Sequence, residues 1–107
     1  MRDTEGDGAL LQQMAARFAR EYPVYLQRID TAIAEGDAEQ LTKAAHRFRG
    51  MLSTLRFIRA AQTTAELEEL GISSELEGVP AACERLREDI DQVLLVFEAQ
   101  VALLTAK

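Results

Sequence analysis

The sequence predicts an all-α fold: an antiparallel four-helix bundle with an additional N-terminal helix. Apolar residues recur at spacings of three and four, which is typical of one buried helix face, and no segment shows the alternation of a strand. With 107 residues, 48% of them hydrophobic, the chain has the size of one domain with its own core. We therefore expect a single domain over residues 1–107, in which residues 1–7 are flexible.

Pro23 is expected to separate the first two helices, because its ring clashes with the preceding turn and its nitrogen has no proton to donate. Asp7 is available to cap the first helix, and Gly36 is expected to end the second. The residues expected to point inward are Leu10, Leu11, Met14, Ala15 and Phe18, then Tyr25, Leu26, Ile29, Ala32 and Ile33.

The third helix is expected to open at Asp37, which together with Gln40 resembles a capping box. From there the helical pattern continues until Gly71, which we expect to close it. An unbroken helix of this length would reach roughly 50 Å, whereas a compact domain of this size has a radius of gyration of about 13 Å. A break is therefore required. The sequence alone does not place it, and residues 55–59 and residues 63–64 are candidates. The inward positions are Leu41, Ala45, Phe48, Leu52, Leu55, Leu67 and Leu70.

Pro80 suits the first turn of the last helix. Its inward residues are expected to be Leu86, Ile90, Val93, Leu94, Phe97, Val101 and Leu104. Leu95, Val96 and Leu103 widen this apolar stripe beyond one face, which leaves a dimerising bundle as a distant alternative. Our expectation is a monomer.

Composition excludes several classes of protein. The net charge of −6 argues against a nucleic-acid binder, since such proteins cluster basic charge against phosphates. No apolar run is long enough to span a membrane, and the N-terminal residues do not resemble a secretion signal, so we expect a cytoplasmic protein. Cys83 is the only cysteine and is expected to be a buried thiol without a role.

The only histidine, His46, lies in a basic segment of this acidic chain. Residues 41–65 contain no Asp or Glu but five cations: Lys43, Arg47, Arg49, Arg56 and Arg59. Such a segment either attracts an acidic partner or is simply a solvated face.

A helical wheel places His46 on the solvent side. With Leu41 at zero, the core positions fall within roughly 40°, whereas His46, Gly50 and Ser53 lie about 120° to 180° away. Gly50 therefore occupies an exposed helical position where alanine would be more stable by about 1 kcal/mol. We infer that an external partner approaches the bare backbone beside the imidazole.

An exposed imidazole among cations suits nucleophilic attack on an anionic electrophile, because its neutral form has a free lone pair near pH 7. Arg49, one turn away, is placed to stabilise the charge of a phosphoryl group. A metal site is disfavoured, since no second histidine or suitable cysteine is present. A Ser–His hydrolase is also disfavoured, because the segment offers no acidic third member near His46.

These residues resemble the histidine-containing phosphotransfer (HPt) domains of bacterial multistep phosphorelays. The family pattern is A-H-x-L-K-G, then a small residue and an L-G pair, and later an L-E pair. Its spacing is matched without gaps over residues 45–68. Here the pattern reads AHRFRG at 45–50, Ser53, Leu55 and Leu67–Glu68. Arg49 replaces the usual lysine, Arg56 replaces the glycine and Met51 a small residue.

The resemblance implies a phosphocarrier that accepts a phosphoryl group on His46 from the phospho-aspartate of a receiver domain and passes it to another receiver. Its partners would be response-regulator receivers and a hybrid sensor histidine kinase. The receiver would contribute magnesium, so the chain itself needs no cofactor, metal or nucleotide and is not an enzyme. The residues expected to bind the partner are Lys43, Arg47, Gly50, Ser53 and Phe57.

Two alternatives stay open at this stage. The chain could be a helical docking or adaptor module whose histidine is chemically idle. In addition, a break near Arg56 would turn Phe57 into the core, whereas an unbroken helix would leave it exposed below His46.

Overall fold

Four α-helices and one short 3-10 helix make up the described part of the chain, without a strand. The computed structural model describes the backbone of residues 3–105 and the side chains of residues 9–103. The elements are α1 (Asp3–Glu35), α2 (Ala38–Thr54), α3 (Ile58–Ser73), the 3-10 helix η1 (Leu76–Gly78) and α4 (Val79–Thr105). None of these helices is long and apolar enough to cross a membrane.

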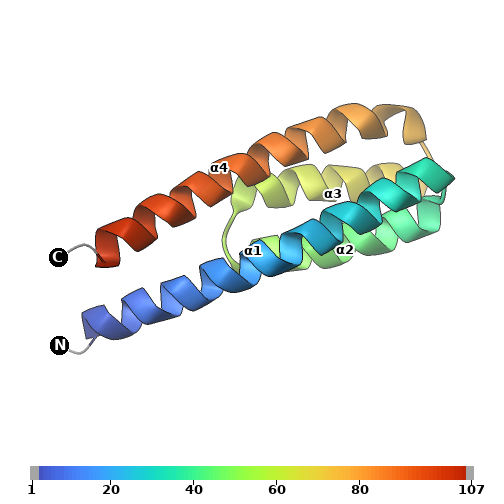
Figure 1. Ribbon diagram of the computed structural model, residues 1–107. Helices are drawn as coiled ribbons and strands as arrows, with labels where there is room; N and C mark the ends of the chain where they lie inside the picture. The colour runs from blue at the N-terminus through green and yellow to red at the C-terminus, as the bar shows by residue number, and fades with distance from the viewer. Residues whose placement is uncertain (1–2, 106–107) are drawn as a thin grey trace.

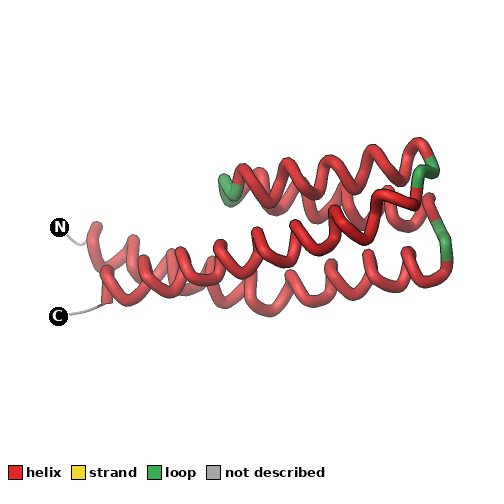
Figure 2. Tube along the Cα trace, turned by 90° about the horizontal axis from the view of Figure 1, so that it is seen from above, coloured by secondary structure: helices red, strands yellow, loops and turns green. Residues whose placement is uncertain are grey.

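The helices lie side by side, and consecutive ones run in opposite directions (Figure 1). The molecule is elongated, with extents of 51 × 19 × 19 Å. Both chain ends lie at the same end of the molecule, where α1 and α4 project beyond the shorter pair α2 and α3 (Figures 1 and 2). The core is formed by one apolar stripe from each α-helix, with Phe18, Phe48, Leu67 and Leu86 among its largest members.

The separate N-terminal helix expected from Pro23 is wrong, because α1 continues through this proline. Pro23 is exposed, while Phe18 and Ile29 on either side of it are buried. Proline disfavours a helix interior by roughly 3 kcal/mol. The burial of Phe18 and Ile29 on one continuous helix outweighs this cost. One lost backbone hydrogen bond does not break a helix that tertiary packing holds on both sides.

The N-terminal start was also misplaced. Helix α1 begins before Asp7, so this residue does not mark its first turn. Of the segment 1–7 expected to be flexible, residues 3–7 belong to α1, and residues 1–2 lie outside the described part. Leu10 is 55% exposed rather than inward, because its part of α1 projects beyond α2. The side chain of Leu104 lies outside the described residues.

The break required between Asp37 and Gly71 lies at residues 55–57, within the first of the two expected ranges. Leu55 caps α2, and Arg56 adopts a left-handed backbone conformation with φ of 66°. This conformation costs an L-residue roughly 1–2 kcal/mol. Arg56 is the position where the family pattern has glycine. Phe57 then turns inward, since its ring packs against Phe18 and Phe97 with centroids 5.6 and 5.1 Å away.

Four predictions about helix ends can be compared directly with the structure. Gly36 follows α1 with φ of 66°, and the Asp37 side chain accepts a hydrogen bond from the Gln40 amide at 3.1 Å, so both are confirmed. Gly71 does not end its helix, because α3 continues to Ser73 and is capped by Ser74 with φ of 58°. Pro80 lies in the first turn of α4, as expected.

Gly71 serves instead to bring α3 close to α2. A Cβ atom at this position would clash with the Thr42 hydroxyl and would lie 3.1 Å from the Thr42 amide nitrogen and 3.2 Å from the Ala38 carbonyl oxygen. Backbone atoms cannot yield as a flexible side chain can. The glycine therefore fixes how closely the two helices approach each other.

Cys83 is half-buried, which agrees only partly with the expected buried thiol. Burial raises its pKa, and the nearby Asp30 carboxylate raises the pKa further. The thiol is therefore protonated at neutral pH and is a poor nucleophile.

Gly50 and Gly71 should respond in opposite ways to alanine. At Gly50 a new Cβ meets nothing within 4 Å among the described residues, so Gly50→Ala should stabilise the domain by about 0.5–1 kcal/mol. Gly71→Ala should destabilise it by about 1–3 kcal/mol, since α2 and α3 must move apart. Urea titrations of both variants measure this difference. Destabilisation by Gly50→Ala would show that Gly50 packs inside its own bundle.

Candidate functional site

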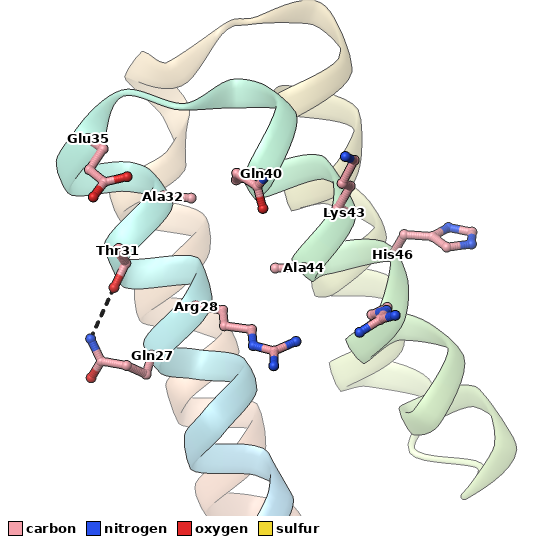
Figure 3. A pocket seen from close by; sticks show the side chains of 10 residues that line it. Gln27, Arg28, Thr31, Ala32, Glu35, Gln40, Lys43, Ala44 and His46 are labelled. Carbon is pink, nitrogen blue, oxygen red and sulfur yellow. Dashed lines mark hydrogen bonds between the residues drawn. The ribbon is translucent and has the colours of Figure 1, made fainter.

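The site is built on α2, where the structure places His46 as the wheel predicted. The imidazole is 64% exposed and points away from α1 (Figure 3). The buried residues Leu41, Ala45, Phe48 and Leu52 hold the opposite face of α2 in the core. His46 is therefore presented to solvent from a rigid helix.

Glu68 on α3 contacts both His46 and Arg49. Its Oε2 lies 2.8 Å from His46 Nδ1, and its Oε1 accepts a hydrogen bond of 2.8 Å from Arg49 Nε. The Glu68 side chain is only 15% exposed, compared with 38% for Arg49. One mostly buried carboxylate thus positions the two side chains expected to carry the chemistry.

This contact determines which ring nitrogen carries the proton. An ionised carboxylate only accepts hydrogen bonds, so Nδ1 of His46 must donate to Glu68. The Arg49 Nη2 atom lies 3.2 Å from the same Nδ1 and is therefore a neighbouring positive charge rather than a donor to that atom. The neutral ring then carries its free lone pair on Nε2.

Sequence reasoning missed Glu68. We expected no acidic group near His46 because residues 41–65 contain none, and Glu68 carried no role beyond its match to the L-E pair of the pattern. The spacing held a signal, however. In an antiparallel helical hairpin that turns at residues 55–57, position 46 lies nine residues before the turn and position 68 eleven after it, so the two come to nearly the same level. The expectation that His46 has no acidic partner is wrong, because the fold supplies the partner from the next helix.

A groove between α1 and α2 lies on the other side of His46. It consists of two adjoining hollows of about 710 and 530 Å³ that share His46 and Arg47. The first contains the cations Arg28, Lys43 and Arg47, and Arg28 reaches from α1 toward α2 (Figure 3). Arg28 lies outside the basic segment of the sequence, so only the fold adds it to this group. We call these two hollows the α1–α2 groove.

The residues expected to bind a partner do not all lie at this groove. Lys43 lines the first hollow, Gly50 the second and Arg47 both. Ser53 is exposed on α2 but lines neither hollow. Phe57 is partly buried and packs against the core, because the turn at Arg56 points its ring inward. Its expected contact with a partner stays a prediction.

Among the described residues, no group of three or more His, Cys, Asp and Glu side chains could hold a metal ion. Glu68 contacts His46 and also forms an ion pair with the cation Arg49. The arrangement is that of an exposed nucleophile with a fixed tautomer, next to a positive charge.

Comparison with known proteins shows what the whole chain is similar to. The Hpt domain family model matches residues 13–95. The chain is similar to the crystal structure of histidine-containing phosphotransfer protein B (HptB) from Pseudomonas aeruginosa PAO1, with 25% sequence identity and a TM-score of 0.76. That match covers 94% of this chain and 85% of the other. A search of curated proteins found no match.

The family match confirms the resemblance drawn from residues 45–68, and it extends well beyond that segment. Its 13–95 span takes in the end of α1 nearest the site, all of α2 and α3 and most of α4. Since this span is most of the 107 residues, the chain belongs to the family of Hpt domains, the phosphotransfer modules of phosphorelays.

Proposed function

We propose that the chain is a phosphocarrier in which His46 Nε2 accepts a phosphoryl group from the phospho-aspartate of a receiver domain and delivers it to a second receiver. The observation that carries this proposal is the contact between His46 Nδ1 and Glu68, which leaves Nε2 exposed as the nucleophilic atom. A hybrid sensor histidine kinase would stand upstream of the first receiver.

The transfer needs no proton to leave the ring. The Nε2 lone pair attacks phosphorus, the bond between phosphorus and the aspartyl oxygen breaks, and its electron pair departs with the aspartate carboxylate. The ring keeps its Nδ1 proton and gains positive charge, which the Glu68 carboxylate stabilises through the 2.8 Å contact. The second transfer reverses these steps on another receiver.

Arg49 has a second task that lysine would perform differently. Its Nε donates a hydrogen bond to Glu68 at 2.8 Å, while its Nη2 lies 3.2 Å from His46 Nδ1. A planar guanidinium can hold a carboxylate with one edge and still offer other N–H groups to a phosphoryl oxygen. A lysine ammonium, as a single point charge, would divide itself between the two anions.

The α1–α2 groove is the proposed docking surface for the receiver. Arg28, Lys43 and Arg47 give it positive charge, and Gly50 leaves the backbone bare along it. Such a surface favours a partner whose own site is acidic. In this proposal the acidic pocket and its magnesium belong to the receiver, and this chain supplies neither a metal nor a nucleotide site.

Replacing His46 tests the phosphocarrier proposal against an adaptor with an idle histidine. His46→Gln should remove phosphoryl acceptance from a phosphorylated receiver, while circular dichroism and the melting temperature stay close to wild type because the side chain is exposed. The readout is acid-labile label on the chain. Label on the His46→Gln variant would contradict the assignment of His46.

Charge at the α1–α2 groove should determine how fast a receiver associates. Arg47→Ala should lower the association rate constant several-fold at low salt, and added salt should reduce this difference from wild type. Arg59→Ala is the matched control: this cation belongs to the same basic segment but lines neither hollow. Stopped-flow measurements at several ionic strengths compare the two. Equal slowing by both variants would mean that the groove is not where the receiver docks.

A further inference from the structure

A second, apolar groove lies between α1 and α4. It has a volume of about 480 Å³, and Glu98 is the only charged residue among the described residues that line it. Its lining consists of Ala15, Ala16 and Ala19 from α1 and Leu94, Phe97, Glu98, Val101 and Ala102 from α4. It shares no described lining residue with the α1–α2 groove.

A large exposed side chain lies beside this hollow of small ones. Leu95 is 57% exposed and precedes Glu98 and Ala102 by three and seven residues, so the three lie on one side of α4. We call Ala15, Ala16, Ala19, Leu95, Glu98 and Ala102 the α1–α4 face. A protruding leucine next to an alanine-lined hollow makes this face complementary to itself.

We propose that the α1–α4 face binds the same face of a second copy of this chain, with Leu95 of each copy in the alanine-lined hollow of the other. A two-fold axis along the helices would place α1 of one copy over α4 of the other, an isologous contact. The α1–α4 face consists of six residues, whereas a standard interface has roughly 20–30 residues a side, so we infer a weak dimer.

The charge around the α1–α4 face favours a second copy as its occupant. Residues 92–106 carry one charge, Glu98, in a chain whose net charge is −6. Contacts between other surfaces of two copies are opposed by the repulsion between their like net charges. The charges that border the face differ in sign: exposed Arg20 lies one turn beyond Ala16 on α1, and exposed Asp91 lies one turn before Leu95 on α4.

The proposed two-fold axis brings these opposite charges together. Phe18 and Phe97 lie at the same level of the molecule, since their ring centroids are 5.8 Å apart. Arg20 therefore lies near the level of Leu95, and the symmetry sets it opposite the acidic border of the other copy, between Asp91 and Glu98. Both His46 sites stay free for receivers, because neither the imidazole nor the α1–α2 groove is part of the contact.

Sedimentation velocity from about 10 μM to about 1 mM tests the weak dimer. The weight-average sedimentation coefficient of wild type should rise with concentration, and Leu95→Glu should abolish the rise. Ile72→Glu is the matched control, since Ile72 is 63% exposed on α3 and should sediment like wild type. A wild type that stays monomeric throughout, or equal loss in both variants, would overturn the proposal.

An exchange of charges between two positions distinguishes this contact from non-specific association. Arg20→Glu and Glu98→Arg should each weaken association about several-fold, and the double variant should regain most of the loss, because the opposite charges are restored across the axis. If the loss of association in the double variant equals the sum of the losses in the two single variants, the proposed pairing of α1 with α4 of the other copy is refuted.

Discussion

The close approach of α2 and α3 is the constraint on which the site depends. At one end of this pair Gly71 lets α3 reach the backbone around Thr42, and at the other the turn through Arg56 reverses the chain. Between these ends Glu68 comes within 2.8 Å of both His46 and Arg49. A wider spacing would leave a mostly buried carboxylate without its partners and the imidazole free to rotate.

The two long helices have a different task. They cover α2 and α3 on one side and supply the aromatic contacts of Phe18 and Phe97 that anchor Phe57. Through Arg28, α1 also completes the basic group of the α1–α2 groove. The contact with Glu68 and the α1–α2 groove proposed for docking therefore lie on opposite sides of one exposed residue, His46.

The sequence predicted helices and most of the core well, because a period near 3.6 depends only on neighbouring residues. It failed where tertiary packing opposes local preference: Pro23 lies inside a helix, and Arg56 adopts a conformation that favours glycine. Compactness correctly required a break before Gly71, yet the molecule extends over 51 Å and tolerates a helix of 33 residues. The exposure of His46 could be predicted from one helix, whereas its partner Glu68 required the pairing of two.

The central claim is that Glu68 fixes His46 with the proton on Nδ1 and the lone pair on Nε2. Because His46 is the only histidine, a long-range ¹H–¹⁵N correlation spectrum contains a single imidazole and reports its tautomer directly. For neutral His46 we expect a protonated Nδ1 and an unprotonated Nε2, and we expect this preference to be lost in Glu68→Ala. A wild-type spectrum dominated by the Nε2–H tautomer, or one unchanged by Glu68→Ala, would contradict this claim.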